Sequence, residues 1–238
     1  MILSRAKNRS QVSVNANTRR QANEGHHGPL IEWGEKEMSA IFLTTVGGAV
    51  HFAFLIQAYP SSPESVLARV LRENVQTGDV WNGPRIRTID FSGMNALEVR
   101  AECAGIRAAV SRILSPLECA VVRARHGLTN YEDEDGERRF FFDGDRVQAL
   151  QYLSTVLASP LYSDVPATVL DVLIARHYAD KKTTPITLRQ IAEAFGRSHT
   201  FYGKIASDLG QRLDKIEMRS LDQLTPYFEM ACHGVSLT

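Results

Sequence analysis

Between residues 187 and 214, polar and basic residues lie on both sides of Gly196. His199, Thr200 and Lys204 have hydrogen-bonding groups of the kind that read base edges in DNA. Cations and a hydroxyl suited to phosphate oxygens flank them, at Arg189, Arg197, Ser198 and Arg212. These residue types indicate nucleic-acid recognition, provided that the local structure brings them to one surface.

The apolar residues of the same stretch predict two helices joined by a tight turn. Gly196 lies between them, and glycine readily adopts the positive φ that such a turn requires. Ser198 is a favourable N-cap for the second helix. The predicted core and turn comprise Leu188, Ile191, Ala192, Phe195, Gly196, Tyr202 and Ile205. This pattern predicts a helix-turn-helix whose second helix can enter the major groove. An ordinary pair of packed helices is the alternative.

The stretch resembles region 4 of the sigma-70-type transcription initiation factors. The likeness rests on residues at that family's signature positions, namely Leu188, Ile191, Ala192, Phe195, Ser198, Tyr202, Ile205 and Leu213. Two upstream segments, Val169–His177 and Leu114–Leu128, are each similar to the helix that precedes the motif in the family. Two explanations are open. Either the region 4-like domain contains a long acidic insertion, or a degenerate first copy of the domain precedes the functional copy.

The resemblance implies double-stranded DNA and RNA polymerase as partners. The family's base-reading positions fall on His199, Thr200, Gly203 and Lys204. The family usually has Arg and Glu at the first two, and Gly203 has no side chain to contact a base. No part of the chain resembles region 2 of a sigma factor. This architecture looks like that of phage or prophage transcription regulators, including late-gene activators and Q-type antiterminators.

Charge is segregated along a chain whose net charge is zero. The 238 residues include 27 Lys and Arg and 27 Asp and Glu, and 44% are hydrophobic, as in a globular protein. Residues 1–29 have five cations and one carboxylate, whereas residues 131–145 have two cations and seven carboxylates. We therefore expect a flexible basic arm at 1–34, a helical interaction domain at 35–128, an acidic insert and linking helix at 129–160, and the region 4-like domain at 161–238.

Hydrophobic periodicity predicts a mainly α fold of several helices. Helices are expected within 35–72, with one starting at Ser61-Ser62-Pro63, and at 97–114, from Ser115, 146–157, 166–178, 188–195, 199–213 and 221–230. Residues 76–84 are predicted to be a loop, 85–91 a short strand or extended link, and 138–142 part of an acidic hairpin. A calcium loop is excluded there, because Gly136 at its sixth position would place Tyr131 and Phe142 where carboxylates are needed.

No other pattern indicates catalysis, metal binding or a membrane anchor. Cys103, Cys119 and Cys232 lack the spacing of a zinc site, and their odd number favours a reducing cytoplasm. Residues 40–59 are uncharged, but Gly47-Gly48 and His51 favour a buried helix over a membrane span. We expect no enzymatic activity, no cofactor and no metal. The competing hypothesis is a protein that binds RNA polymerase without binding DNA on its own, which the acidic segment favours.

Overall fold

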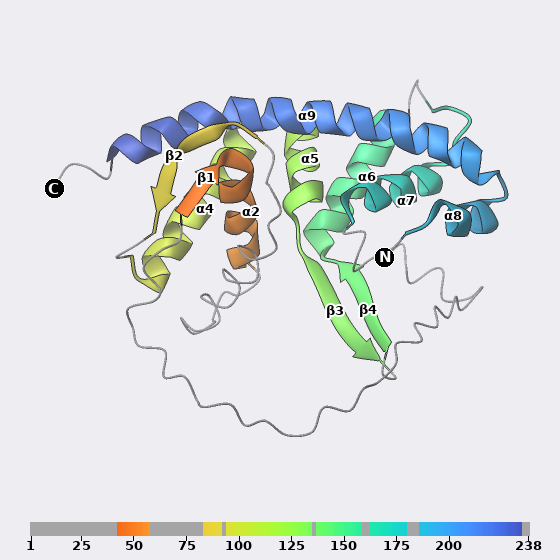
Figure 1. Ribbon diagram of the computed structural model, residues 1–238, viewed down its shortest axis with the longest axis horizontal. Helices are drawn as coiled ribbons and strands as arrows, with labels where there is room; N and C mark the ends of the chain where they lie inside the picture. Colours follow the sequence, from red (N-terminus) through yellow and green to blue (C-terminus); the bar gives the residue numbers. More distant parts are fainter. Residues whose placement is uncertain are drawn as a thin grey trace. The chain divides into compact units, whose positions relative to one another are not determined.

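The computed structural model describes residues 42–57, 83–91, 94–134, 137–158, 162–179 and 186–234 (Figure 1). Its helices are α2 (Val46–Gln57), α4 (Ala96–Ile113), α5 (Pro116–His126), α6 (Gly144–Ala158), α7 (Ala167–Tyr178), α8 (Leu188–Phe195) and α9 (His199–Gly234). Its strands are β1 (Phe42–Thr45), β2 (Arg85–Asp90), β3 (Thr129–Glu134) and β4 (Glu137–Phe142). The predicted mainly α fold is confirmed. The predicted arm at 1–34 and the predicted helix start at Ser61 lie outside the described residues.

Local capping explains where two central helices begin. Asn95 caps α4, and its side chain accepts hydrogen bonds from the backbone N–H groups of Leu97 and Glu98. Ser115 caps α5 in the same way, with Glu118 completing the capping box and Pro116 in the first turn. A capping box satisfies N–H groups that have no partner within the helix. The helix starts predicted near 97 and at Ser115 are therefore confirmed.

The segment Phe42–Thr45 was predicted to be helical, but it forms the strand β1. It pairs antiparallel with β2, the strand predicted at 85–91. The Thr45 hydroxyl then accepts a hydrogen bond from Gly48 N at 3.1 Å, and α2 begins at Val46. Segment Phe42–Thr45 is therefore a strand because it pairs with a strand about 40 residues away, although its local apolar pattern favours a helix.

None of the described helices combines the length and the apolar character needed to cross a membrane.

The predicted acidic hairpin is present and is longer than expected. Strands β3 and β4 pair antiparallel from Thr129↔Phe142 to Glu134↔Glu137. The acidic residues of β3 lie opposite the basic residues of β4, in the pairs Glu132↔Arg139 and Asp133↔Arg138.

Two hydrophobic cores lie side by side along α9 (Figure 1). The first core packs α2, β2 and α4 against the C-terminal half of α9. The second packs α5, α6 and α7 against α8 and the N-terminal half of α9. Helix α6, predicted as a linking helix within the insert 129–160, contributes Ala149, Leu150, Leu153 and Leu157 to the second core. The described residues between 42 and 234 belong to one compact unit.

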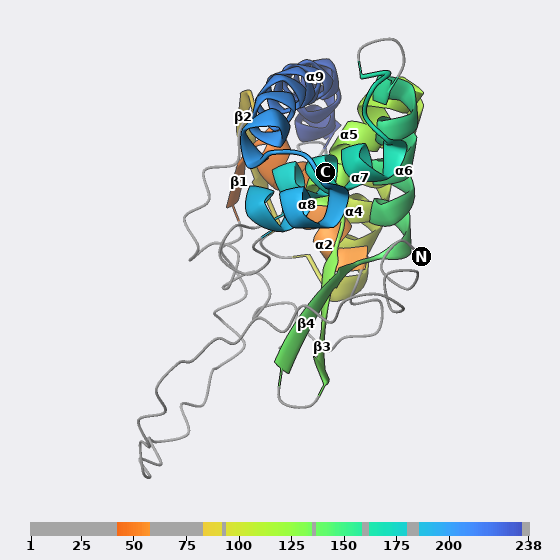
Figure 2. The same cartoon turned by 90° about the vertical axis from the view of Figure 1, so that its right-hand side faces the viewer.

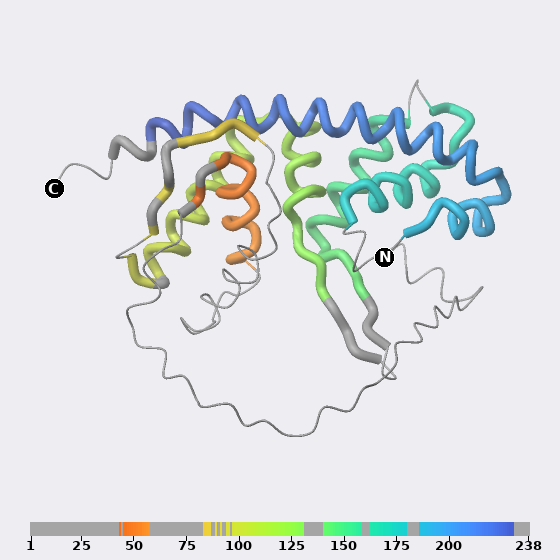
Figure 3. Tube along the Cα trace, in the orientation of Figure 1, coloured from red at the N-terminus to blue at the C-terminus, as the bar shows by residue number. Residues whose placement is uncertain are grey.

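Helix α9 is continuous where two helices were predicted. The trace in Figure 3 runs without a break between the helices predicted at 199–213 and 221–230. The inward positions of the joining segment are occupied by Glu217 and Ser220, which are both buried. The helical spacing persists there, but the residues at the buried positions are polar. Hydrophobic periodicity could not detect the continuation for that reason.

The buried carboxylate of Glu118 joins the two halves of the fold. Glu118 is 2% exposed, and its Oε1 accepts hydrogen bonds from Arg219 Nε and Gln223 Nε2 of α9, both at 2.8 Å. Its Oε2 accepts from the hydroxyl and backbone N–H of Ser115. Burial raises the pKa of Glu118, but the hydrogen bonds from Ser115 and Arg219 outweigh burial and hold that pKa below its usual value.

The guanidinium of Arg146 joins three elements of the second core. Arg146 is 4% exposed; its Nε donates to the Ala124 carbonyl at 2.9 Å, and its Nη2 to the Tyr178 carbonyl at 2.8 Å. Its Nη1 donates to the Gly127 carbonyl and to the Thr129 hydroxyl. A cation therefore lies at the C-terminal ends of both α5 and α7, where the helix dipole favours positive charge.

Replacing Arg146 should destabilise the second core. In Arg146→Ala, the buried carbonyls of Ala124 and Tyr178 lose their donors, and we expect the free energy of unfolding to fall by about 3 kcal/mol. Urea denaturation measures this change. Arg123→Ala, which removes an exposed arginine from α5, is the matched control and should change stability by less than about 0.5 kcal/mol. Equal effects of the two substitutions would contradict the role given to Arg146.

Glu118 should contribute to the acid sensitivity of the fold. Because its pKa is lower in the folded chain than in the unfolded chain, its stabilisation is complete above the unfolded pKa and is lost as the pH falls through the folded pKa. Glu118→Gln should therefore be less stable than the parent at pH 7, with the gap narrowing between about pH 5 and pH 3. Denaturant titrations at several pH values measure the gap. A gap that does not change with pH would refute this contribution.

Candidate nucleic-acid interface

Helix α8 is a short helix with a defined start and end. Thr187 caps it, with Gln190 completing a capping box. The helix ends at Gly196, which has a φ of 80°. Residues other than glycine rarely adopt a positive φ, so the position of Gly196 in the sequence sets the position of the turn. The predicted role of Gly196 is confirmed.

The turn between α8 and α9 is held by hydrogen bonds from both sides. The Ser198 hydroxyl accepts from Phe201 N at 3.1 Å, which caps the start of α9. The Tyr202 hydroxyl donates to the Phe195 carbonyl at 3.4 Å and links α9 back to the end of α8. Ser198 therefore has the capping role that its sequence position predicted.

The predicted helix-pair core is partly or fully buried at all but one of its side chains. Ile191 and Tyr202 lie within the second core, and Leu188, Ala192 and Ile205 pack against it. Phe195 is the exception, because its side chain is 38% exposed. It is the last residue of α8, and the side chain of Tyr202 reaches back toward the turn in its place. The assignment of Phe195 to the inner face was wrong.

The three residues predicted to read bases lie exposed on the first two turns of α9. His199, Thr200 and Lys204 are all exposed, and α8 and the start of α9 face the viewer in Figure 2. Arg189 is exposed on α8. The guanidinium carbon of Arg197 lies 5.4 Å from the centre of the Phe201 ring, which is a cation–π contact. Sequence analysis missed this role of Phe201, which the spacing of four residues between Arg197 and Phe201 could have indicated.

Arg212 is not part of this exposed end. It follows His199 by 13 residues, about 20 Å along the helix axis. Its Nε lies 3.0 Å from Asp208 Oδ2, and the Tyr162 hydroxyl donates to the same carboxylate. The hydrogen bond from Tyr162, followed by that from Arg212, lowers the pKa of Asp208. The structure thus places Arg212 in an ion pair within α9, and the hydrogen bond from Tyr162 to the same Asp208 carboxylate connects α9 to the segment before α7.

Gly203 faces α8 and not the open side of α9. A methyl group added to its Cα would lie 3.6 Å from Leu188 Cδ1, which is ordinary van der Waals contact. Gly210, two turns later, faces His177 of α7 much more closely, since an added methyl group would lie 3.2 Å from Nδ1. His177 Nε2 is in turn 3.0 Å from Asp214 Oδ1. The two glycines therefore mark the crossings of α9 with α8 and with α7.

Comparison with known proteins identifies no relative: no protein-family model matches the chain, and no curated protein matches it.

The two glycines of α9 should respond differently to the same substitution. Gly203→Ala should raise the free energy of unfolding by up to about 1 kcal/mol, because alanine favours the helix and has room beside Leu188. Gly210→Ala should be less stable than Gly203→Ala, because its methyl group presses on His177. Thermal denaturation of both variants beside the parent measures the difference. The opposite order of stability would mean that the crossings are assigned wrongly.

Proposed function

We propose that the protein is a DNA-binding transcription regulator of phage or prophage type, which acts through a sigma region 4-like helix-turn-helix formed by α8 and α9. The observation that carries the proposal is the division of this helix pair into two faces. Ile191 and Tyr202 are buried, whereas His199, Thr200 and Lys204 are exposed on the first two turns of α9. A recognition helix requires this division, because its base-reading side chains must be free while the helix is held from behind.

The charge of this exposed end supports contact with DNA. From Thr187 to Lys204 the cations are Arg189, Arg197 and Lys204, and the carboxylate is Glu193. The N-terminal end of α9 adds the positive end of the helix dipole and backbone N–H groups that can bind phosphate oxygens. We assign Arg189 and Arg197 to phosphates on either side of the groove, with α9 entering between them.

In this arrangement the first two turns of α9 lie in the major groove. His199, Thr200 and Lys204 then reach base edges, with Lys204 suited to guanine O6 and N7. Ser198 contributes by capping α9, and Gly203 contributes by packing on α8, so neither is assigned a base contact. RNA polymerase is the proposed second partner, and Q-type antitermination or late-gene activation is the proposed outcome.

Selection from a pool of random duplexes tests DNA binding without knowledge of the operator. The full chain should enrich a defined sequence, and a gel shift with that duplex should weaken steeply as salt is raised. A reporter with a terminator downstream of the selected site then separates antitermination from activation. If no duplex is enriched and none is retarded even at low salt, the proposal of DNA binding fails.

Lys204 and Lys215 provide a matched pair for the site. Both are exposed lysines of α9, but Lys215 lies 11 residues further along, about 16 Å from the proposed groove contact. Lys204→Ala should weaken binding to the selected duplex by about 10-fold or more, with relaxed specificity at one base pair. Lys215→Ala should bind like the parent. Fluorescence anisotropy at fixed salt measures both, and equal affinities of the two variants would overturn the assignment of Lys204.

A second function is favoured by the acidic sequence of β3, which would repel DNA phosphates. In that case the protein binds RNA polymerase and does not bind DNA on its own. Strand β3 runs from Thr129 to Glu134, and its last three residues are all carboxylic acids. A pull-down with purified polymerase, run beside the duplex selection, distinguishes the two functions. Capture of polymerase without enrichment of any duplex would favour this second function.

A further inference from the structure

Arg197 lies in the turn before α9, and its side chain contacts the ring of Phe201. The guanidinium carbon is 5.4 Å from the centre of the ring, within the range of a cation–π interaction. Phe201 belongs to the first turn of α9. Arg197 is exposed, whereas Phe201 is partly buried. The contact therefore joins a surface cation to a side chain that the fold supports.

The second core holds the Phe201 ring from behind. Phe201 packs against that core and meets the Tyr202 ring edge-on, with 5.3 Å between the two ring centres. Tyr202 is 2% exposed, and its hydroxyl donates to the Phe195 carbonyl. The backbone N–H of Phe201 donates to the Ser198 hydroxyl. The ring is therefore a fixed surface for the arginine.

An aromatic ring holds an arginine without neutralising its charge. Arg212, on the same helix, is held instead by the carboxylate of Asp208, and that negative charge offsets the attraction of Arg212 for a phosphate. The face of a ring attracts a cation through its π-electrons and has no net charge. Among the described residues, no carboxylate forms an ion pair with Arg197. The full charge of Arg197 therefore remains available for phosphate oxygens.

The position of Arg197 makes such a support necessary. Helix α8 ends at Phe195 and α9 begins at His199, so Arg197 lies outside both helices. An exposed arginine side chain has several rotatable bonds, and fixing them when a ligand binds costs conformational entropy. A contact that restricts the side chain before binding reduces that cost. The Phe201 ring can therefore raise affinity without touching the ligand.

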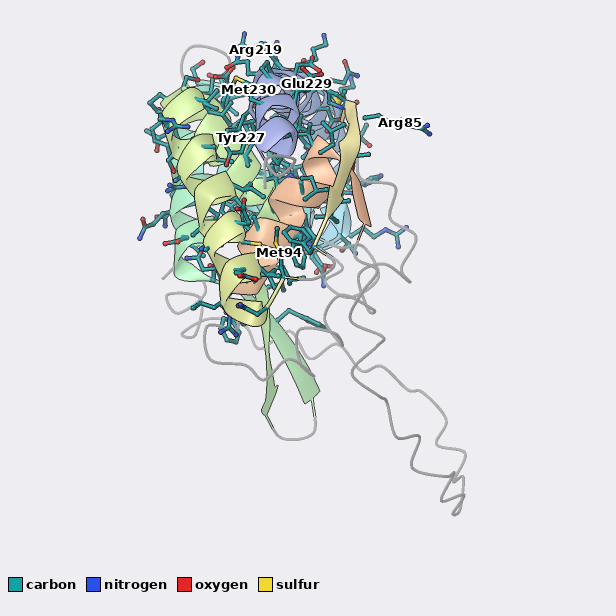
Figure 4. All side chains as sticks on the ribbon, turned by 90° about the vertical axis from the view of Figure 1, so that its left-hand side faces the viewer. Arg85, Met94, Arg219, Tyr227, Glu229 and Met230 are labelled. Carbon is teal, nitrogen blue, oxygen red and sulfur yellow. The ribbon has the colours of Figure 1, made fainter. Side chains whose placement is uncertain are left out.

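A similar pair of rings lies at the other end of α9, without this role. Tyr227 and Phe228 also meet edge-on with 5.3 Å between their ring centres, and Tyr227 packs against the first core. Figure 4 shows Tyr227 on the part of α9 beside α4. It follows Phe201 by 26 residues, about 39 Å along the helix axis. Tyr227 thus matches Phe201 in packing but lies far from the proposed DNA contact.

We propose that Phe201 is a positioning residue for the contact between Arg197 and a DNA phosphate. This inference rests on the proposed function. The ring holds the guanidinium beside the first turn of α9, where the positive end of the helix dipole favours the same phosphate. The contact contributes affinity and not sequence discrimination, because the phosphate is the same at every base pair.

Nuclear magnetic resonance of the full chain tests the contact without DNA. Side-chain hydrogens of Arg197 that lie over the ring are shifted upfield by its ring current. Phe201→Leu should remove this shift, whereas Phe201→Tyr keeps a ring and should retain it. Tyr227→Leu should leave it unchanged. Identical Arg197 side-chain shifts in the parent and in Phe201→Leu would overturn the inference.

Binding to the selected duplex tests the role of the contact in the interface. Phe201→Leu should weaken binding by about 3-fold to 5-fold, whereas Phe201→Tyr and Tyr227→Leu should bind like the parent. The dependence of affinity on salt should not change in Phe201→Leu, because the charge of Arg197 remains. In Arg197→Ala, the slope of log affinity against log salt should fall by about one. Circular dichroism confirms that each variant is folded, and a folded Phe201→Leu that binds like the parent would overturn the inference.

A double-mutant cycle separates positioning from a general effect on the fold. In an Arg197→Ala background, Phe201→Leu should have no further effect, because no guanidinium remains to be positioned. In an Arg189→Ala background, which is the control, it should keep its full effect. Equal effects in the two backgrounds would overturn the inference while DNA binding stands. A parent that enriches no duplex would instead refute the proposed function, and the phosphate contact with it.

Discussion

The contact between Glu118 and α9 sets the register on which both cores depend. One helix must supply Tyr202, Leu209 and Leu213 to the second core and Leu221, Leu224 and Phe228 to the first. A slip of one residue would turn every one of these side chains by about 100° and bury charged neighbours in their place. Glu118 opposes such a slip because its buried carboxylate takes hydrogen bonds from Arg219, which lies between the two apolar sets, and from Gln223, which precedes Leu224. The polar contact therefore contributes specificity to a packing that apolar contacts stabilise.

Contacts further along α9 also fix the position of its exposed N-terminal turns. Two further contacts hold the helix against the second core, namely His177 with Asp214 and the Tyr162–Asp208–Arg212 group. Their α9 members, Asp208, Arg212 and Asp214, lie about one to three turns beyond Lys204, so they position the first turns without occupying their open face. A recognition element held in this way loses little conformational freedom when it binds, because the helix is already ordered. This arrangement explains why Arg212, although basic and on the right helix, has a structural role.

Sequence reasoning succeeded wherever a local signal sufficed. The helix start at Ser115, the cap Ser198 and the turn glycine Gly196 each act within a few residues, and the helix ends beside them were placed correctly. It failed where distant parts of the chain decide the outcome. Strand β1 forms because β2 pairs with it. Helix α9 continues through Glu217, which lies 3.5 Å from Arg125 of α5, and through Ser220, whose hydroxyl donates to the Ile216 carbonyl. The exposure of His199 and Lys204 followed from helical spacing, whereas the hydrogen bond from Tyr162 to Asp208, the ion-pair partner of Arg212, required the fold of the segment before α7.

Helix α9 connects the proposed DNA contact to both cores. It has 36 residues and is about 54 Å long. Its first turns carry the proposed contact, its middle packs in the second core, and its C-terminal half, which contains Pro226, packs in the first core. The position of the first turns is therefore set by the packing of one continuous helix and not by a flexible linker. Glu217 and Ser220, the buried polar residues that hid this continuity from the sequence, lie where the helix passes from one core to the other.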